Sequence, residues 1–352
     1  MKSPKVSIVC ISYNHQDFIS EAIDSFLAQK TDFDVEIIVA DDASSDRTAQ
    51  IIRSYGDNHS NIRAILRKEN IGVQDNLLDA MSLANGTYIA LCEGDDFWTD
   101  RNKLQQQVDF MDTHKDFSVC FHRVEVFFEK DVTNNYLSPS KVDINKNQTV
   151  DILQLLSNNV IPTNSVLYRN AYEYKKLNNK VMPLDWYLHA YHATKGKIYF
   201  IDKVMGKNRR HENGVWWAVQ QDPNVVWTKY SNGWIELFSE FLNLFGSNDQ
   251  YFRTIKINLL DFFEAQLRFY KINEFSELSK KIIKKNSLKN VFIEWSIDRL
   301  PVVEHEVKKI VDHMDGQLRI VESQHEDIER LKKEIDELQN SWWYKLKSKL
   351  KI

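Results

Sequence analysis

Short apolar runs alternate with helical stripes in the N-terminal part of the chain, and this alternation restricts the possible fold more than any other feature of the sequence. Strand-like runs occupy residues 6–11, 35–40, 62–66 and 88–92. Apolar residues at helical spacing follow each of the first three runs. Since strands that alternate with helices form parallel sheets covered on both faces, we expect an α/β fold with a mixed, mostly parallel, Rossmann-like sheet and flanking helices.

Polar and acidic side chains follow three of these runs, and open α/β sheets bind ligands at the carboxyl ends of their strands. The candidates are Tyr13 and Asn14 after the first run, Asp41 and Asp42 after the second, and Glu93, Asp95 and Asp96 after the fourth. We therefore expect the two acidic clusters to meet at one edge of the sheet.

The adjacent carboxylates of Asp95 and Asp96 are the sharpest chemical feature. They repel each other unless a cation or hydrogen-bond donors neutralise them. Mg²⁺ or Mn²⁺ would do so and keep coordination positions open for phosphate oxygens, although a helix cap or a turn is a simpler role. Asp41 and Asp42 can accept hydrogen bonds from a nucleobase or from ribose hydroxyls. The Ser45-Asp46 pair that follows is expected to cap the next helix.

Charge and cysteine content argue against several classes of protein. The chain has 46 basic and 50 acidic residues and a formal net charge of -4, so it lacks the basic field of a nucleic-acid-binding protein. Cys10, Cys92 and Cys120 lie in apolar runs without a CxxC pair, which favours buried thiols over metal ligands and indicates a reducing compartment. The apolar run at residues 6–11 is too short to span a membrane and has no cleavage site, so we expect a cytoplasmic protein.

The C-terminal part of the chain is predicted to be helical. Residues 225–300 carry apolar and aromatic side chains at helical spacing. A heptad seam from Val307 to Trp342 predicts a coiled coil and hence a homo-oligomer. The end of the chain combines Trp and Leu with lysines, so it either lies on an anionic membrane surface or is a solvated basic end. The expected boundaries are 1–220 for the α/β domain, 221–300 for a helical appendage, 301–340 for the coiled coil and 341–352 for the basic tail.

Five segments match the motifs of one known family in order and spacing. They are Val6-Ser7-Ile8-Val9, Asp41-Asp42-Ala43-Ser44-Ser45-Asp46, Asn70-Ile71-Gly72, Ala84-Asn85-Gly86-Thr87-Tyr88-Ile89-Ala90 and Glu93-Gly94-Asp95-Asp96-Phe97-Trp98. Together they resemble the family 2 glycosyltransferases of the GT-A fold, including those that build bacterial cell-envelope polysaccharides. The resemblance covers the part of the chain before the helical appendage.

This resemblance implies an inverting transferase that moves a sugar from a nucleotide-sugar donor, most commonly UDP-linked in the family, to a hydroxyl of a glycan or lipid-linked acceptor. It implies that the donor nucleotide is held among Tyr13, Asn14, Asp41, Asp42 and Asp95, and a Mn²⁺ or Mg²⁺ cofactor by Asp95 and Asp96. The usual Asp-x-Asp motif reads Glu93-Gly94-Asp95 here. Glu93 therefore ranks below Asp95 and Asp96 as a candidate metal ligand.

The resemblance also places a catalytic base at Asp185. A sugar hydroxyl is a poor nucleophile until a carboxylate takes its proton, which is why the family needs an acid there. Capping of the following helix is the alternative role. Arg209 and His211 match positions near the donor diphosphate, where a guanidinium can pair with phosphate oxygens. A basic surface turn is the alternative for this pair.

Two other functions compete with this interpretation. A nucleotidyltransferase should carry a Gly-rich phosphate loop with a Lys near the N-terminus, and Ser12-Tyr13-Asn14-His15 is not such a loop. A non-catalytic coiled-coil scaffold with a transferase-like, nucleotide-binding domain is the second, and the joint presence of the acidic residues above argues against it. We expect a cytoplasmic transferase, peripheral at the inner face of the membrane, that acts in cell-envelope polysaccharide synthesis.

Overall fold

The computed structural model describes residues 3–130, 132–140, 148–170, 173–212, 214, 217, 229–269, 272–296 and 333. Residues 1–290 form one compact unit and residues 291–352 a second one. Apart from residue 333, the predicted coiled coil and basic tail lie outside the described residues, so both stay predictions.

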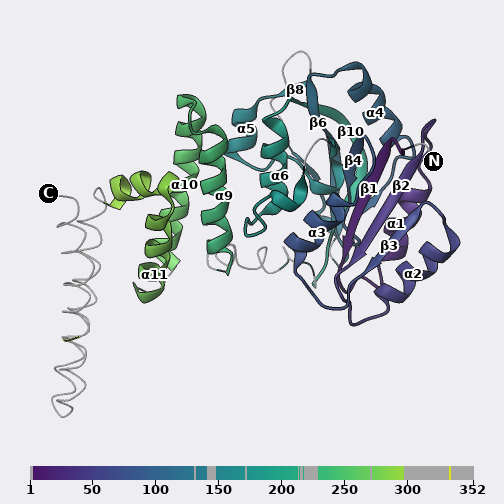
Figure 1. Cartoon of the computed structure of the whole chain (residues 1–352), viewed down its shortest axis with the longest axis horizontal. Helices are drawn as coiled ribbons and strands as arrows, with labels where there is room; N and C mark the ends of the chain where they lie inside the picture. Colours follow the sequence, from purple (N-terminus) through teal and green to yellow (C-terminus); the bar gives the residue numbers. More distant parts are fainter. Residues whose placement is uncertain are drawn as a thin grey trace, which may run out of the picture. The chain divides into compact units, whose positions relative to one another are not determined.

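A mixed ten-stranded sheet forms the centre of the first unit (Figure 1). Its strands are β1 (Val6–Ser12), β2 (Val35–Asp41), β3 (Ile62–Leu66), β4 (Tyr88–Leu91), β5 (Phe97–Trp98), β6 (Phe117–Phe128), β7 (Tyr136–Ser138), β8 (Thr149–Val150), β9 (Leu167–Arg169) and β10 (Lys197–Arg210). The order is β3-β2-β1-β4-β9-β6-β10-β5, with β7 paired to β6 and β8 to β10. Neighbours from β3 to β4 are parallel, as are β6 and β10, whereas β9 is antiparallel to both of its neighbours. The predicted mostly parallel α/β sheet is confirmed.

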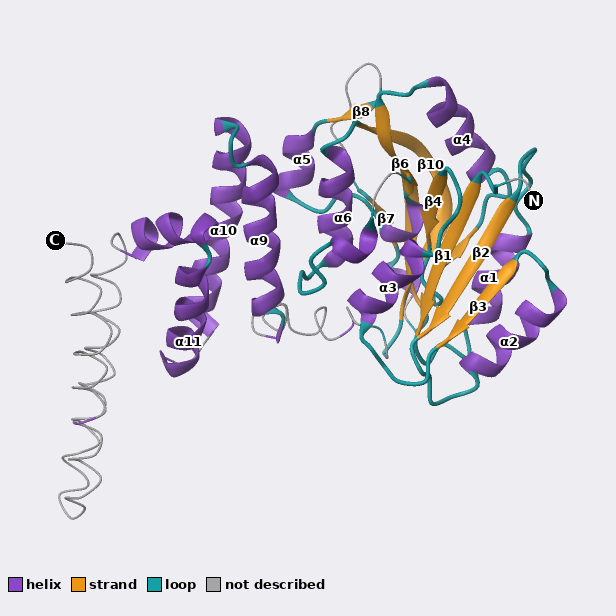
Figure 2. Cartoon of the chain, viewed as in Figure 1, coloured by secondary structure: helices purple, strands orange, loops and turns teal. Residues whose placement is uncertain are grey.

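Helices cover the sheet and extend the unit beyond it (Figure 2). They are α1 (Ile19–Leu27), α2 (Thr48–Asn58), α3 (Val73–Ser82), α4 (Lys103–Thr113), α5 (Ile152–Ser157), α6 (Leu184–Ala193), α9 (Ser231–Phe245), α10 (Asp249–Phe269) and α11 (Ile272–Lys284). Val6, Ile8 and Cys10 of β1 share a buried cluster with apolar residues of α1, α2 and α4. The alternate residues of β1 face the other side, and they are buried as well. The strand is therefore buried throughout and mostly apolar, because both of its faces are covered.

One pairing in this sheet positions the loop that follows the central strand β4. The antiparallel pairing of β5 with β10, Trp98 opposite Gly206 and Phe97 opposite Lys207, holds the loop after β4 against the end of β10.

In the helical region, α9 contacts α6 and α10 contacts α5. None of the helices in the described parts of the chain is both long enough and apolar enough to cross a membrane.

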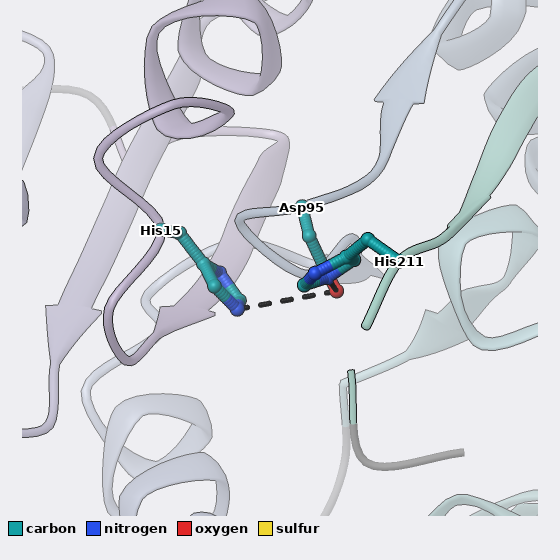
Figure 3. A group of neighbouring side chains, drawn as sticks. All are labelled: His15, Asp95 and His211. Carbon is teal, nitrogen blue, oxygen red and sulfur yellow. Dashed lines mark hydrogen bonds and ion pairs between the residues drawn. The ribbon is translucent and has the colours of Figure 1, made fainter. Parts of the chain in front are cut away.

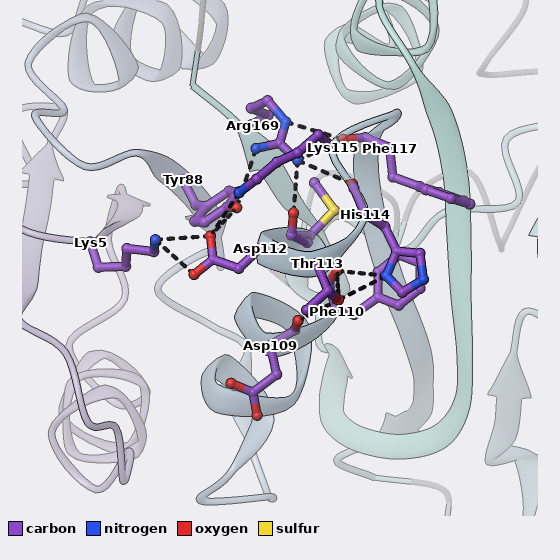
Figure 4. A network of polar contacts seen from close by, with 11 residues as sticks. Lys5, Tyr88, Asp109, Phe110, Asp112, Thr113, His114, Lys115, Phe117 and Arg169 are labelled. Atoms are coloured by element: carbon purple, nitrogen blue, oxygen red, sulfur yellow. Dashed lines mark hydrogen bonds and ion pairs between the residues drawn. The ribbon is translucent and has the colours of Figure 1, made fainter.

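A polar network ties the amino ends of β1 and β4 to α4 and β9 (Figure 4). The buried Tyr88 hydroxyl donates to Asp112 Oδ1 at 2.8 Å and accepts from Arg169 Nη1 at 3.2 Å. Lys5 Nζ forms an ion pair with the same aspartate at 2.8 Å. Burial, reinforced by the hydrogen bond to Asp112, raises the pKa of Tyr88 to about 12. The network therefore fastens four elements at the end of the sheet away from the acidic strand ends.

We expect Tyr88→Phe to lower the free energy of unfolding by about 1–3 kcal/mol, because it leaves buried polar partners without their hydroxyl. The matched control is Tyr55→Phe, whose hydroxyl bonds Asp24 at 2.7 Å on the surface and should contribute less than about 0.5 kcal/mol. Urea denaturation followed by circular dichroism measures both values. Equal losses of unfolding free energy in the two variants would show that the buried Tyr88 hydroxyl contributes no more to stability than the surface Tyr55 hydroxyl.

Candidate active site

A cleft of about 590 Å³ opens where the loops after β1, β2 and β4 meet the end of β10. Most of the residues predicted from the sequence line it, namely Tyr13, Asp42, Glu93, Asp95, Asp96, Asp185, Arg209 and His211. Asn14 and Asp41 are not among the lining residues. The two acidic clusters thus meet at one edge of the sheet, as expected.

Asn14 and Asp41 hold the loops after β1 and β2 together. The Asn14 N–H donates to Ser44 Oγ at 2.8 Å, and Asn14 Oδ1 accepts from the Ser45 N–H at 2.8 Å. Ser44 donates both its N–H and its hydroxyl to the buried Asp41 carboxylate. Asn14 and Ala43 adopt left-handed backbone angles, with φ of 57° and 59°, which residues other than glycine rarely do. The side chains of Asn14 and Asp41 therefore hold the two loops together and do not themselves line the cleft.

Asp42 fixes the next loop in the same way. Its two carboxylate oxygens accept the N–H groups of Ile71 at 2.8 Å and Gly72 at 3.0 Å. Gly72 has a φ of 90°, a conformation that favours glycine. The N-cap position of α2 belongs to Arg47, but Asp46, one residue earlier, accepts the Thr48 N–H at the start of the helix with its Oδ1 at 2.9 Å.

The loop after β4 carries three acids, Glu93, Asp95 and Asp96, and the protein shifts their pKa values in different directions. Burial, reinforced by the charge of Asp95, raises the pKa of Glu93 to about 8. Burial also raises the pKa of Asp96 well above its ordinary value, together with the charges of Asp95 and Glu93. Burial acts in the same direction on Asp95, but the nearby His15 and His211 outweigh it and lower that pKa to about 2. Asp95 is thus the one acid of the three whose pKa the surrounding protein lowers.

Asp96 is held by donors from the end of β10. Its Oδ1 accepts the Arg209 N–H at 2.7 Å, and its Oδ2 accepts Asn208 Nδ2 at 2.6 Å. The side chain is 2% exposed. Since donors within the chain already engage both oxygens, this geometry suits an anchor between two loops better than a metal ligand.

The Arg209 guanidinium is likewise engaged within the protein. It forms ion pairs with Glu21 and Glu129 and donates from Nε to the Asp95 carbonyl at 2.8 Å. The predicted pairing of Arg209 with a diphosphate would compete with these acids. The neighbouring Arg210 also lines the cleft, and its Nε is buried without a hydrogen-bond partner among the described residues. Arg210 is therefore the better placed of the two to meet a ligand.

Asp95 faces two histidines (Figure 3). His211 Nε2 lies 3.1 Å from Asp95 Oδ2, and His15 Nε2 lies 3.9 Å from the same oxygen. The ligand atoms of His15, Asp95 and His211 all lie within 4.8 Å of one another, whereas Glu93, whose buried Oε2 has no hydrogen-bond partner in the described part of the chain, does not belong to this group. One carboxylate and two imidazole nitrogens form a donor set that fits a divalent cation.

Asp185 lies in the first turn of α6, and the N-cap position belongs to Pro183. Capping therefore does not explain the residue. Asn159 Nδ2 and Thr163 Oγ1 donate to Asp185 Oδ2 at 2.9 and 3.1 Å. No hydrogen bond to Oδ1 occurs within the described residues, so this oxygen is available to a ligand in the cleft.

The sequence did not single out several of the lining residues, among them His15, Asn159, Thr163, Arg210 and Trp234. His15 lies three residues after the end of β1, next to the candidates Tyr13 and Asn14, and this position was the signal that could have identified it. Asn159 and Thr163 stand on no recognisable motif. Trp234 comes from α9, whose Gly233 contacts Met182 so closely that an added Cβ would lie 2.3 Å from Met182 Cβ. A contact over this sequence distance leaves no local pattern.

Comparison with known proteins adds independent findings. A family model described as glycosyl transferase family 2 matches residues 7–174. An uncharacterised protein of Mycobacterium tuberculosis is 42% identical over 240 residues, which is 68% of each chain. A protein of Escherichia coli named UDP-Glc:alpha-D-GlcNAc-diphosphoundecaprenol beta-1,3-glucosyltransferase is 35% identical over 142 residues, or 39% of this chain and 53% of its own.

Solved structures show the same fold. The crystal structure of TarS from S. aureus in complex with UDP superposes with a TM-score of 0.55 at 18% sequence identity, covering 79% of each chain. The complex of TarS with UDP-GlcNAc gives a TM-score of 0.54 at 18% identity over 81% of each chain. At this identity the likeness concerns the fold.

Proposed function

Since the chain belongs to glycosyl transferase family 2, we propose that it is an inverting glycosyltransferase that moves a sugar from a UDP-linked donor to a hydroxyl of a lipid-linked glycan. The proposed process is the synthesis of a cell-envelope polysaccharide at the cytoplasmic face of the membrane. The named Escherichia coli relative acts on a diphosphoundecaprenol-linked acceptor, which supports this choice of acceptor class.

One observation carries the proposal. A single cleft is lined by Tyr13 and Asp42, by the Asp95 and His211 pair, and by the Asp185 carboxylate from a different element. We assign these three groups to the donor nucleoside, to its diphosphate and to the acceptor hydroxyl. The cleft volume of about 590 Å³ falls within the range of small-molecule sites.

The proposed reaction is a direct displacement. Asp185 Oδ1 takes the proton of the acceptor hydroxyl while the acceptor oxygen attacks the anomeric carbon. The new carbon–oxygen bond forms as the bond from that carbon to the diphosphate breaks, so the configuration inverts. Asn159 and Thr163 keep the base in place by holding Asp185 Oδ2.

Asp95 and His211 are the residues that would hold a divalent cation, Mn²⁺ or Mg²⁺. When bound, such a cation neutralises the negative charge of the departing diphosphate. Asp96 and Arg209 contribute indirectly, because they connect the loop that carries Asp95 to the end of β10 that carries His211. Tyr13 is 48% exposed at the mouth of the site and can stack on the nucleobase.

A donor panel tests the proposal. The purified full-length protein is incubated with UDP-glucose, UDP-N-acetylglucosamine, UDP-galactose or GDP-mannose, with Mn²⁺ or EDTA, and with a GlcNAc-diphosphate lipid as acceptor. We expect one UDP-sugar to give metal-dependent UDP release and a glycosylated lipid of inverted configuration, detected by mass spectrometry and NMR. Absence of binding and turnover with every donor would instead support the non-catalytic scaffold.

The hydrogen bonds to Asp185 predict a positioning role for two neighbouring residues. We expect Asn159→Ala and Thr163→Val each to lower kcat about 10- to 100-fold with little change in the donor KM, because each removes one bond to a charged oxygen. Thr163→Ser should recover most of the activity. Asn158→Ala is the matched control, since this exposed neighbour lines the cleft without bonding Asp185. Steady-state kinetics decides, and a rise in KM at constant kcat would contradict the positioning role.

A further inference from the structure

We infer that His15 is a third protein ligand of the divalent cation, so that the site consists of two imidazoles and one carboxylate. The inference extends the proposed function, since the cation is the one that would neutralise the donor diphosphate. It concerns a residue that belongs to none of the sequence motifs described above and follows the first strand.

The three side chains already lie close to the separations that a shared metal ion requires. The candidate ligand atoms of His15, Asp95 and His211 all lie within 4.8 Å of one another. Ligands bonded at about 2.1 Å to one ion stand roughly 3.0–3.5 Å apart. The Asp95 to His211 separation of 3.1 Å meets this condition, and the His15 to Asp95 separation of 3.9 Å needs only a small side-chain rotation.

The fold holds the His15 ring beside Asp95. The His15 carbonyl accepts the N–H groups of Phe18 and Ile19, each at 2.9 Å, so the residue is fixed at the start of α1. Gly94 leaves the space that the ring occupies, because an added Cβ there would lie 3.0 Å from His15 Nδ1. The Phe18 ring packs against the His211 ring with centroids 4.7 Å apart and lies 6.4 Å from His15. Both imidazoles are thus confined next to the carboxylate.

His15 has no competing role among the described residues. Its Nδ1 is buried without a hydrogen-bond partner, and its Nε2 points towards Asp95. The side chain is 16% exposed, so water does not fully satisfy the ring. A partly buried polar ring directed at the Asp95 carboxylate is available to a cation that enters between them.

This ligand set predicts which metals the site prefers. Imidazole nitrogens favour Mn²⁺, Co²⁺ and Zn²⁺ over Mg²⁺, which prefers oxygen ligands and retains its water shell. A metal bound by His15 would also link the loop that carries Tyr13 to the end of β10. The same ion would then hold in place both the loop proposed to contact the donor nucleoside and the residues proposed to contact its diphosphate.

Direct Mn²⁺ binding tests the inference without any nucleotide sugar. Mn²⁺ affinity is measured by electron paramagnetic resonance on the full-length protein, and pulsed spectra report coupling to histidine nitrogens. We expect wild type to show two coupled nitrogens, and both His15→Ala and His211→Ala to show one and to bind Mn²⁺ at least about 10-fold more weakly. His114→Ala should match wild type, because His114 is exposed and does not line the cleft. Circular dichroism confirms that each variant is folded.

His15→Asp provides a second readout, because an oxygen ligand should restore binding and shift the ratio of Mg²⁺ to Mn²⁺ affinity towards Mg²⁺. The inference is overturned if His15→Ala keeps both coupled nitrogens and wild-type affinity, or if wild type binds no Mn²⁺. The Mn²⁺ binding test does not depend on turnover, which the donor panel measures separately. If the protein bound Mn²⁺ through His15 but released no UDP in the donor panel, only the proposed function would be contradicted.

Discussion

Asp185→Asn is expected to lower the rate of sugar transfer at least about 100-fold while the protein still binds its donor. The amide keeps the size of the carboxylate and can still face Asn159 and Thr163, but it cannot take a proton from the acceptor hydroxyl. Removal of a positioned general base typically costs about 10²- to 10⁴-fold in rate. We expect kcat for transfer to fall within that range.

The measurement separates transfer from binding. Initial rates of lipid glycosylation give kcat, and isothermal titration with the preferred UDP-sugar gives the donor affinity. Asp57→Asn is the matched control, because Asp57 is exposed on α2 and does not line the cleft. If Asp185→Asn retained more than a tenth of wild-type transfer, another residue of the cleft would have to be the base.

Asp95→Ala is expected to remove both metal binding and turnover. The residue supplies the ionised carboxylate that faces His15 and His211, and no other acid in the loop has its pKa lowered. Loss of one such charge-stabilising group typically costs about 10²- to 10³-fold in kcat. We expect at least this loss, together with a UDP release rate that no longer responds to Mn²⁺ or EDTA.

Asp96→Ala provides the contrast. It leaves the Arg209 N–H and Asn208 Nδ2 without their acceptor in a buried position, and each unsatisfied donor costs about 1–3 kcal/mol. We therefore expect Asp96→Ala to lower the free energy of unfolding by about 2 kcal/mol or more. Asp95→Ala should lower it as well, because the lowered pKa of Asp95 means that its ionised form stabilises the fold, but only Asp95→Ala should lose Mn²⁺ binding. Denaturant titration of both variants decides. If Asp96→Ala lost Mn²⁺ binding without losing stability, Asp96 would be a ligand as the sequence motif suggested.

The proposed metal site shows where sequence patterns stop being informative. The Glu93-Gly94-Asp95-Asp96 segment pointed to a loop that lines the cleft, because acidic residues after a buried strand concentrate charge at a sheet edge. It could not rank its own members. That ranking depends on the partners that other elements supply, namely the Arg209 backbone for Asp96 and two imidazoles for Asp95.

The donor loops and Arg209 follow the same principle. Asn14 and Asp41 were predicted to contact the nucleotide, but their hydrogen-bonding groups are engaged by Ser44 and Ser45 of the adjacent loop. Arg209 was predicted to contact phosphate, but Glu21 and Glu129 engage its guanidinium. Direct contact of these residues with the donor stays a prediction, and the geometry favours support roles for them.

The sequence by itself determined the α/β class, the order of the first four strands along the chain, the loops that carry the site and the family. These features follow from local periodicity and from motifs of adjacent residues, which one segment of chain carries alone. Tertiary structure alone decided the antiparallel insertion of β9, the contact of α9 with α6, and the meeting of His15 with His211. Each of these joins segments far apart in the chain, and their contacts depend on packing and shared hydrogen bonds that leave no periodic trace in either segment.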